Sequence, residues 1–249
     1  MYPANLVETE TSISPARILA LGAAPVQSLY IHVPFCRAKC QYCDFYSVAS
    51  CNSDAILNDF VEAMLREAQW WSAYLKPQSP ISTVFFGGGT PTVLPPDAMR
   101  RLISGLRSSF HMNAEAEWTI EANPATIDAD YCRMLLDGGV NRLSIGAQSL
   151  IDSELRILGR IHDAEQVKRT VRDAQAAGFK RLSIDLMYAV PHQTLASWRQ
   201  SLEMALALGI SHISCYCLTL EEGTPMWQKT QNGDLPTVGE EAQLELGFL

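Results

Sequence analysis

Short apolar runs alternate six times with longer amphipathic stretches along the chain. The runs are rich in Ile, Leu, Val, Phe and Ser, which is typical of strands whose outer face is covered by helices. The predicted strands are 28–35, 81–86, 117–122, 142–147, 181–188 and 212–220. The predicted helices are 54–75, 96–110, 128–136, 164–177 and 194–208.

The repeated strand–helix order predicts the fold. Strands joined by crossovers of this length run parallel, with right-handed connections. Six units are too few to close the eightfold barrel, so we expect an α/β fold with a partial (β/α)6 TIM-like barrel. The expected division is a lead-in over 1–27, the barrel core over 28–226 and a C-terminal region over 227–249. Residues 240–249 begin an amphipathic helix, either the start of a truncated region or a final helix docked on the barrel rim.

Composition limits the class of protein. A chain of 249 residues with 47% hydrophobic and 18% charged residues suits one ordinary globular domain. A net charge of −8 without a basic stripe argues against nucleic acid as the main partner. No apolar run is long enough to span a membrane, and the N-terminus lacks the pattern of a signal peptide. Seven cysteines fit a reducing compartment, so we expect a cytoplasmic protein.

Three cysteines dominate the chemistry of the chain. Cys36, Cys40 and Cys43 form a Cys-x-x-x-Cys-x-x-Cys motif directly after the first predicted strand. Thiolates select iron–sulfur clusters or zinc, but a structural zinc normally has four protein ligands and ferredoxins supply four cysteines per cluster. Three thiolates on one loop can hold three irons of a cubane and leave the fourth iron open to a small molecule. We therefore favour an open-site [4Fe–4S] cluster, with a zinc site and unrelated free thiols as the alternatives.

The cysteine motif and its flank Tyr30-Ile-His-Val-Pro-Phe-Cys36 resemble the radical S-adenosylmethionine (SAM) superfamily. The match is to the branch that holds the oxygen-independent coproporphyrinogen III oxidases and the HemW-type heme chaperones. It runs from about Leu29 to Met226, which makes 28–226 a radical SAM core. The resemblance implies that the amino and carboxylate groups of SAM chelate the fourth iron. It also implies an electron donor whose electron, passed through the cluster, cleaves the sulfonium of SAM.

The resemblance also implies a set of cofactor contacts, most of which follow predicted strands at the rim where barrels place their sites. Residues without Cβ let the backbone approach a ligand closely, and the segment Gly87-Gly-Gly-Thr-Pro-Thr92 provides them after the second strand. Carboxylates would accept hydrogen bonds from the amino or ribose groups of SAM. The expected set is Tyr30, Tyr42, Gly88, Gly89, Thr90, Glu121, Gln148, Arg160 and Asp185. The alternatives are a plain turn for the glycines, capping or surface pairing for Gln148 and Arg160, and core packing for the tyrosines.

Other candidate residues receive no cofactor role. We expect His162 at the surface or in a helix cap. Cys51, Cys132, Cys215 and Cys217 form no second cluster motif, and we interpret them as small buried hydrophobic residues.

Details of the motifs distinguish the two branches. The oxidases carry a fourth cysteine two residues after the third, where this chain has Phe45, which favours a heme chaperone that passes heme to an acceptor protein. The alternatives are an oxidase that decarboxylates coproporphyrinogen III and an inactive fragment. The segment Tyr188-Ala-Val-Pro-His-Gln-Thr194 has Ala and His where relatives typically have glycines, which would stiffen or fill this loop. The chaperones' heme-associated His-Asn-x-x-Tyr-Trp segment has no counterpart here, so heme binding is an implication of the family alone.

Overall fold

A single parallel sheet forms the centre of the molecule. The computed structural model describes residues 26–49, 53–75 and 79–248, so Cys51 and nearly all of the lead-in lie outside the described residues. The strands lie in the order β1-β4-β5-β6-β7-β8, and every neighbouring pair is parallel. They are β1 (Ser28–Val33), β4 (Ile81–Gly88), β5 (Met112–Ala122), β6 (Arg142–Gln148), β7 (Arg181–Tyr188) and β8 (His212–Cys217). Within the described residues β1 and β8 are the two edges of the sheet, which confirms the open, partial barrel.

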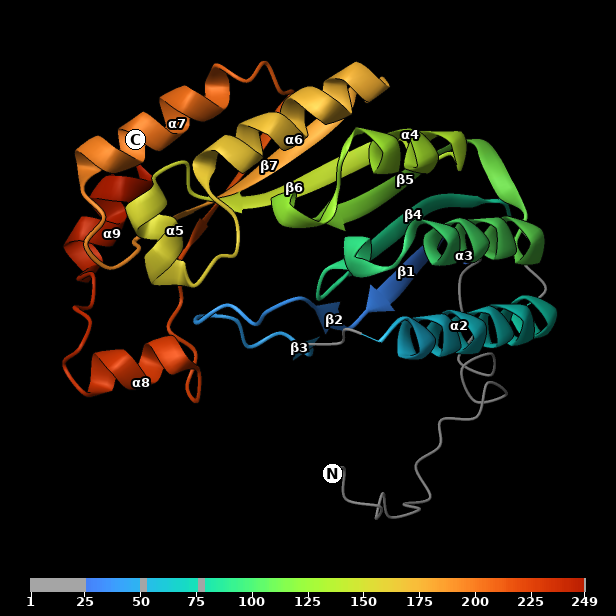
Figure 1. The fold of residues 1–249 in the computed structure, drawn as a ribbon, viewed down its shortest axis with the longest axis horizontal. Helices are drawn as coiled ribbons and strands as arrows, with labels where there is room; N and C mark the ends of the chain where they lie inside the picture. The colour runs from blue at the N-terminus through green and yellow to red at the C-terminus, as the bar shows by residue number, and fades with distance from the viewer. Residues whose placement is uncertain (1–25, 50–52, 76–78, 249) are drawn as a thin grey trace, which may run out of the picture.

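Helices cover the convex outer face of this sheet (Figure 1). They are α2 (Asp54–Leu75), α3 (Pro96–Ser109), α4 (Ala129–Asp137), α6 (Ala164–Ala177) and α7 (Leu195–Leu206). Each predicted helix is present, because apolar side chains recur along one face; in α3, for example, Leu102 and Leu106 are buried one turn apart. Helix α6 ends at Gly178, whose φ of 115° lies in the left-handed region.

Alternation along the strands separates the core from the concave face. On β5, Trp118 and Ile120 point outward and are buried beneath the helices, together with Phe86 of β4. Thr119 and Glu121, which alternate with them, point to the concave side, since successive strand side chains face opposite ways. These side chains of β5 are polar, and the apolar core lies between the sheet and the helices.

Several short elements were not predicted from the pattern. They are β2 (Phe35–Cys36), β3 (Val48–Ala49), α5 (Asp152–Leu158), α8 (Pro225–Gln231) and two single 3₁₀ turns, Pro91–Val93 and Pro124–Thr126. The predicted strand 28–35 breaks between Val33 and Phe35, where Pro34 lacks a backbone N–H for the ladder. Helix α8 also runs across position 226, the expected end of the core.

The last helix, α9 (Glu240–Gly247), packs against α7 and β7 of the barrel. Leu246 is buried, and the indole Nε1 of Trp198 on α7 donates a hydrogen bond of 2.9 Å to the carbonyl oxygen of Leu246. A buried apolar anchor and a buried hydrogen bond explain how eight residues hold a helix that would be marginal alone.

The prediction for the remaining cysteines was right for Cys132, which is fully buried, and wrong for Cys215, which is exposed. Cys217 is half-buried. Both lie on β8, an edge strand whose outer face is only partly covered. No helix in the described part of the chain is both long and apolar enough to cross a bilayer.

Candidate cluster and cofactor site

The three cysteines of the motif line one cavity of about 420 Å³ at the carboxyl ends of the strands. Cys36 ends β2, and Cys40 and Cys43 lie in the following segment 37–47, here called the cluster loop. The backbone N–H of Val48 donates to the Pro34 carbonyl at 2.6 Å and closes this loop. All three thiols are half-buried.

Two short helices hold the cluster loop at Gln41, which lies between Cys40 and Cys43. Its N–H donates to the Leu158 carbonyl at the end of α5 (3.1 Å), and its carbonyl accepts from the N–H of Met226 on α8 (2.9 Å). Lys229 Nζ on α8 donates to Gln41 Oε1 (2.8 Å). Gly159, in the left-handed region at φ 72°, leaves the space for this residue, since a Cβ there would lie 2.8 Å from Gln41 Cγ.

Arg160 joins the cluster loop to the sheet. Its Nη1 donates to Cys40 Sγ at 3.1 Å and its Nη2 donates to the Gly146 carbonyl on β6 at 2.7 Å. The side chain is buried, and within the described part of the chain its Nε has no hydrogen-bond partner. Tyr42 lies beside it, and burial raises the pKa of that phenol despite the nearby guanidinium. A buried arginine at a cysteine ligand stabilises the thiolate form that a metal requires.

The glycine segment packs against the start of the cluster loop. Gly88 has a φ of 114°, a conformation that side chains rarely adopt, and a Cβ on Gly89 would lie 2.7 Å from the Phe35 carbonyl oxygen and 3.0 Å from Cys36 Sγ. Thr90 Oγ1 lies 3.6 Å from Cys36 Sγ. A larger residue at position 89 would therefore displace the cysteine itself as well as any ligand.

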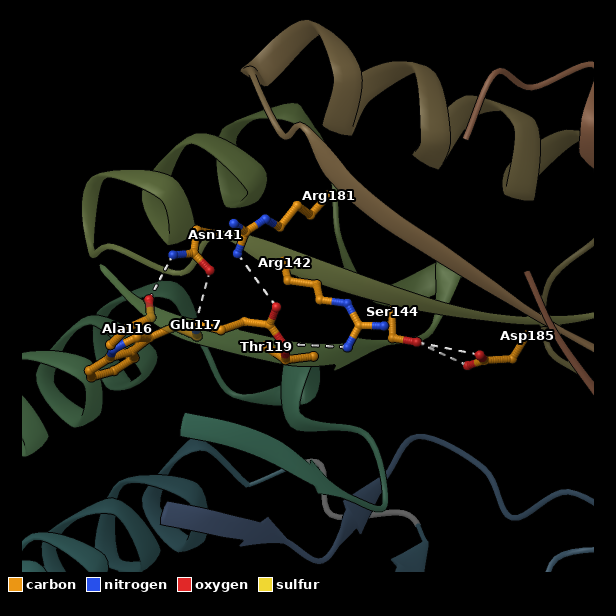
Figure 2. Close-up of polar contacts among 9 residues, drawn as sticks. Ala116, Glu117, Thr119, Asn141, Arg142, Ser144, Arg181 and Asp185 are labelled. Atoms are coloured by element: carbon orange, nitrogen blue, oxygen red, sulfur yellow. Dashed lines mark hydrogen bonds and ion pairs between the residues drawn. The ribbon is translucent and has the colours of Figure 1, made fainter. Parts of the chain in front are cut away.

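Two carboxylates from neighbouring parts of the sheet face the same cavity. Burial and the nearby Asp185 raise the pKa of Glu121 to about 7, and a hydrogen bond from the Gly88 backbone offsets part of this. Burial also raises the pKa of Asp185, against the effect of hydrogen bonds from Ser214 and Ser144. The Ser144 hydroxyl donates to Asp185 at 3.2 Å (Figure 2). The carboxylates thus favour a ligand with positive charge or hydroxyl donors, which would relieve their repulsion.

A β-bulge at the end of β6 changes the direction of the Gln148 side chain. The register between β6 and β7 shifts between Gly146 and Gln148, and Gln148 has a φ of 71°. This bulge turns the end of β6 toward the cavity, which Gln148 lines.

Tyr30 is placed differently from the other predicted site residues. Of the twelve predicted residues, eleven line the cavity, whereas the Tyr30 ring is 59% exposed on the concave face and stacks on Phe85. Its hydroxyl contacts His32 Nδ1 at 3.1 Å.

His162 is buried, so its prediction as a surface or capping residue was wrong. Its Nε2 contacts the Ala147 carbonyl at 3.0 Å and its Nδ1 contacts Asn123 Oδ1 at 3.2 Å. Burial and the charge of Arg160 lower the pKa of His162 to about 4. It supports Asn123, a cavity residue that the sequence did not single out although it directly follows a strand.

Further cavity residues follow β7 and β8. Met187, Tyr216, Thr219 and Glu221 complete the wall opposite the cluster loop. Their positions at or just after strand ends are the same signal that identified Glu121.

The donor set fits a cubane cluster. Three thiols share one cavity whose volume is in the range of ordinary cofactor sites. Among the described residues no three His, Cys, Asp or Glu side chains converge closely enough to hold a single metal ion. A mononuclear zinc site needs such convergence, whereas a cubane binds each thiolate through a different iron. Three thiols in one cavity therefore fit three corners of a [4Fe–4S] cluster.

Comparison with known proteins gives the family. The model of the radical SAM superfamily matches residues 30–205. The heme chaperone HemW of Escherichia coli (strain K12) is 40% identical over 80% of this chain and 52% of its own length. Radical S-adenosyl methionine domain-containing protein 1, mitochondrial, of Bos taurus is 35% identical over 88% of this chain and 49% of its own length.

A solved structure agrees with these sequence relatives. Coproporphyrinogen III oxidase (HemN) from Escherichia coli, described as a radical SAM enzyme, has a TM-score of 0.84 at 28% identity, over 93% of this chain and 53% of its own. The chain thus spans about half the length of the relatives it matches. Because the family model covers most of the chain and the cysteine motif with it, the chain belongs to the radical SAM superfamily, a family that binds a [4Fe–4S] cluster and SAM.

Proposed function

We propose that the protein holds a [4Fe–4S] cluster on Cys36, Cys40 and Cys43, binds SAM at the open iron, and handles heme as a chaperone. One observation carries the cofactor part: eleven of the twelve residues implied by the resemblance line a single cavity. Those residues come from different strands and loops, so their common location does not follow from sequence proximity.

The residues of the cavity have distinct roles in this proposal. When bound, the cluster supplies an electron to the sulfonium of SAM. Glu121 accepts hydrogen bonds from the amino group of SAM and Asp185 from a ribose hydroxyl, and both carboxylates face the cavity. Gly88 leaves the backbone open to the ligand, and Arg160 keeps Cys40 in place through its bond to Sγ.

The heme part of the proposal rests on Phe45 and on the named relatives. Phe45 stands where the oxidases have a further cysteine; it lines the cavity and its side chain is 67% exposed. A phenyl ring at this position neither binds metal nor transfers protons. Two curated relatives, from Escherichia coli and Haemophilus influenzae, are named heme chaperones. The second candidate function is coproporphyrinogen III oxidation, which the structural similarity to the oxidase supports.

Anaerobic reconstitution tests the cofactor part. The protein should become brown, and SAM should alter the electron paramagnetic resonance spectrum of the reduced cluster. Cys40→Ser should lose the cluster because a hydroxyl is a poor ligand at a soft site. Cys132→Ser is the matched control, since that buried thiol lies outside the cavity and the variant should keep the cluster. Zinc-loaded, colourless protein from iron-replete anaerobic cells would contradict the proposal.

The same reconstituted sample separates the two heme-related functions. Titration with heme should produce a saturable shift of the Soret band. Coproporphyrinogen III with SAM and a reductant should release no carbon dioxide. Release of carbon dioxide in proportion to substrate consumed would replace the chaperone assignment with the oxidase.

A further inference from the structure

One row of side chains crosses the concave face of the sheet below the cofactor cavity. The strand registers pair Tyr30 with Phe85, Phe85 with Thr119, Thr119 with Arg142, and Arg142 with Arg181. Residues paired in this way point to the same face of the sheet. The row therefore carries two aromatic rings at the β1 edge and two guanidinium groups toward β8.

Within the described residues, the two arginines at this end of the row share one ion-pair partner, Glu117. Glu117 is 3.7 Å from Arg142 Nη1 and 3.5 Å from Arg181 Nη1, and the three side chains lie together on neighbouring strands (Figure 2). Both separations are long for charge-assisted hydrogen bonds. The side chains of Arg142 and Arg181 are 26% and 58% exposed, so both remain accessible to a ligand. These two positive charges stand in a chain with a net charge of −8.

The aromatic end of the row presents a flat apolar surface. The rings of Tyr30 and Phe85 are stacked, with centroids 6.1 Å apart and planes inclined by 23°. A Cβ on the neighbouring Gly87 would lie about 3 Å from both rings, so the rings pack directly against this glycine and a side chain there would displace them. The bond from the Tyr30 hydroxyl to His32 fixes the exposed ring.

Charges of opposite sign occupy the two ends of the strands. Asp185 lies four residues beyond Arg181 on β7, which places them about 13 Å apart along the strand. The acidic end suits the cationic groups of SAM and repels carboxylates. The basic end attracts carboxylates, so a ligand with acidic arms has one preferred orientation on this face.

We propose that this row binds a flat aromatic macrocycle with carboxylate arms, the chemistry of heme. The macrocycle would lie against Tyr30 and Phe85, and the carboxylates would pair with Arg142 and Arg181. The two ends are about three strand spacings apart, roughly 14 Å along the sheet, so a single small ring would not reach both. The inference rests on the proposed heme-handling function and assigns it a surface outside the cluster cavity.

The test compares two ligands that differ only in the carboxylates. Cluster-loaded protein is titrated with heme and with heme dimethyl ester, and the Soret difference spectrum is followed. Arg181→Gln should weaken heme binding roughly tenfold, the size of one charged hydrogen bond, and leave the affinity for the ester unchanged. Glu117→Gln should tighten heme binding, because it frees both arginines. Arg172→Gln is the control: this residue forms an exposed ion pair on the helix side and should change neither affinity.

The outcomes distinguish this inference from the proposed function. Suppose that the unaltered protein binds heme. If Arg181→Gln then lowers the affinity for heme and for its dimethyl ester equally, or changes neither affinity, the proposed carboxylate site is wrong and the heme proposal stands. If the unaltered protein binds no heme, both fail. Arg142→Gln repeats the test from the neighbouring strand, and its unfolding midpoint shows whether a lost affinity reflects lost folding.

Discussion

At the scale of single residues, the loop after β7 carries the clearest strain. Ala189 and His192 have φ values of 63° and 65°, in the region that favours glycine. These are the two positions at which the resemblance leads us to expect glycines. That the loop is stiffened stays a prediction. Its backbone at both positions is left-handed without the residue that adopts this conformation at no steric cost.

His192→Gly should therefore stabilise the protein. The removed strain of about 1–2 kcal/mol exceeds the added entropy of the unfolded chain, about 0.5–1 kcal/mol, so we expect a net gain of about 0.5–1 kcal/mol in the free energy of unfolding. The measurement is denaturant unfolding. Ala207→Gly is the control, because this exposed residue has an ordinary φ of −67° and should lose stability. Equal losses of unfolding free energy in His192→Gly and Ala207→Gly would contradict the inference that the backbone at His192 is strained.

Glu121 makes the free energy of unfolding depend on pH, and the direction of its pKa shift fixes the sign of that dependence. Its pKa in the folded protein is about 7, above the ordinary 4.5, so its stabilising contribution is complete below about pH 4.5 and is lost as the pH rises through 7. In SAM-free protein, Glu121→Gln should be more stable than the parent at pH 8, by on the order of 2 kcal/mol, and equally stable near pH 4.5. Denaturant unfolding at both pH values measures this. Glu203→Gln is the control. Because Glu203 is exposed on α7, the change should not alter how much the free energy of unfolding differs between pH 4.5 and pH 8.

At the scale of elements, the long strands and amphipathic helices were predictable, since each contains several repeats of its own period. Helices α5 and α8 were not, because seven residues contain fewer than two full turns. Yet these two helices hold Gln41 and thereby the cluster loop. The residues that bind the cofactor were thus easier to predict than the elements that position them.

Gly159→Ala tests this support of the cluster loop. The new Cβ would press on Gln41, so the reconstituted cluster should bleach several-fold faster in air, followed by its visible absorbance. Gly178→Ala is the control: its φ of 115° is even less favourable for alanine than the 72° of Gly159, but its nearest neighbour is Leu136 at 3.7 Å, far from the loop. Both variants should lose about 1–2 kcal/mol of stability. Equal bleaching rates would mean that α5 does not position the cluster.

Helix α9 offers a second test at this scale. Leu246→Ala removes a buried side chain from the cluster that includes Trp198, and we expect a loss of about 2–3 kcal/mol. The change should also alter tryptophan fluorescence, because the indole of Trp198 bonds to the Leu246 carbonyl. Leu244→Ala, on the same helix but 60% exposed, should cost little. Similar small effects from both would show that α9 is not held by its apolar anchor.

At the scale of the whole molecule, the open barrel explains which parts of the site the sequence reveals. Parallel strands bring their carboxyl ends to one rim, so Glu121, Gln148 and Asp185 were predictable as neighbours from strand order alone. The row from Tyr30 to Arg181 was not predictable, because it depends on register, and a shift of one residue would turn either arginine to the outer face. The set of side chains that share the concave face depends on how the strands pair in the sheet and not on any motif.

The last prediction concerns a longer molecule. A chimera that joins this chain to the unmatched half of the Escherichia coli heme chaperone should bind heme more tightly than either part, because two linked contact surfaces act at high effective concentration. Arg181→Gln should still weaken the chimera, since the concave face would contribute its own carboxylate contacts. The chimera should release no carbon dioxide from coproporphyrinogen III, because Phe45 replaces the further cysteine of the oxidases. Heme titration and carbon dioxide release on one sample measure both effects. If the chimera binds heme more tightly but Arg181→Gln does not weaken that binding, all of the heme contacts lie in the added half.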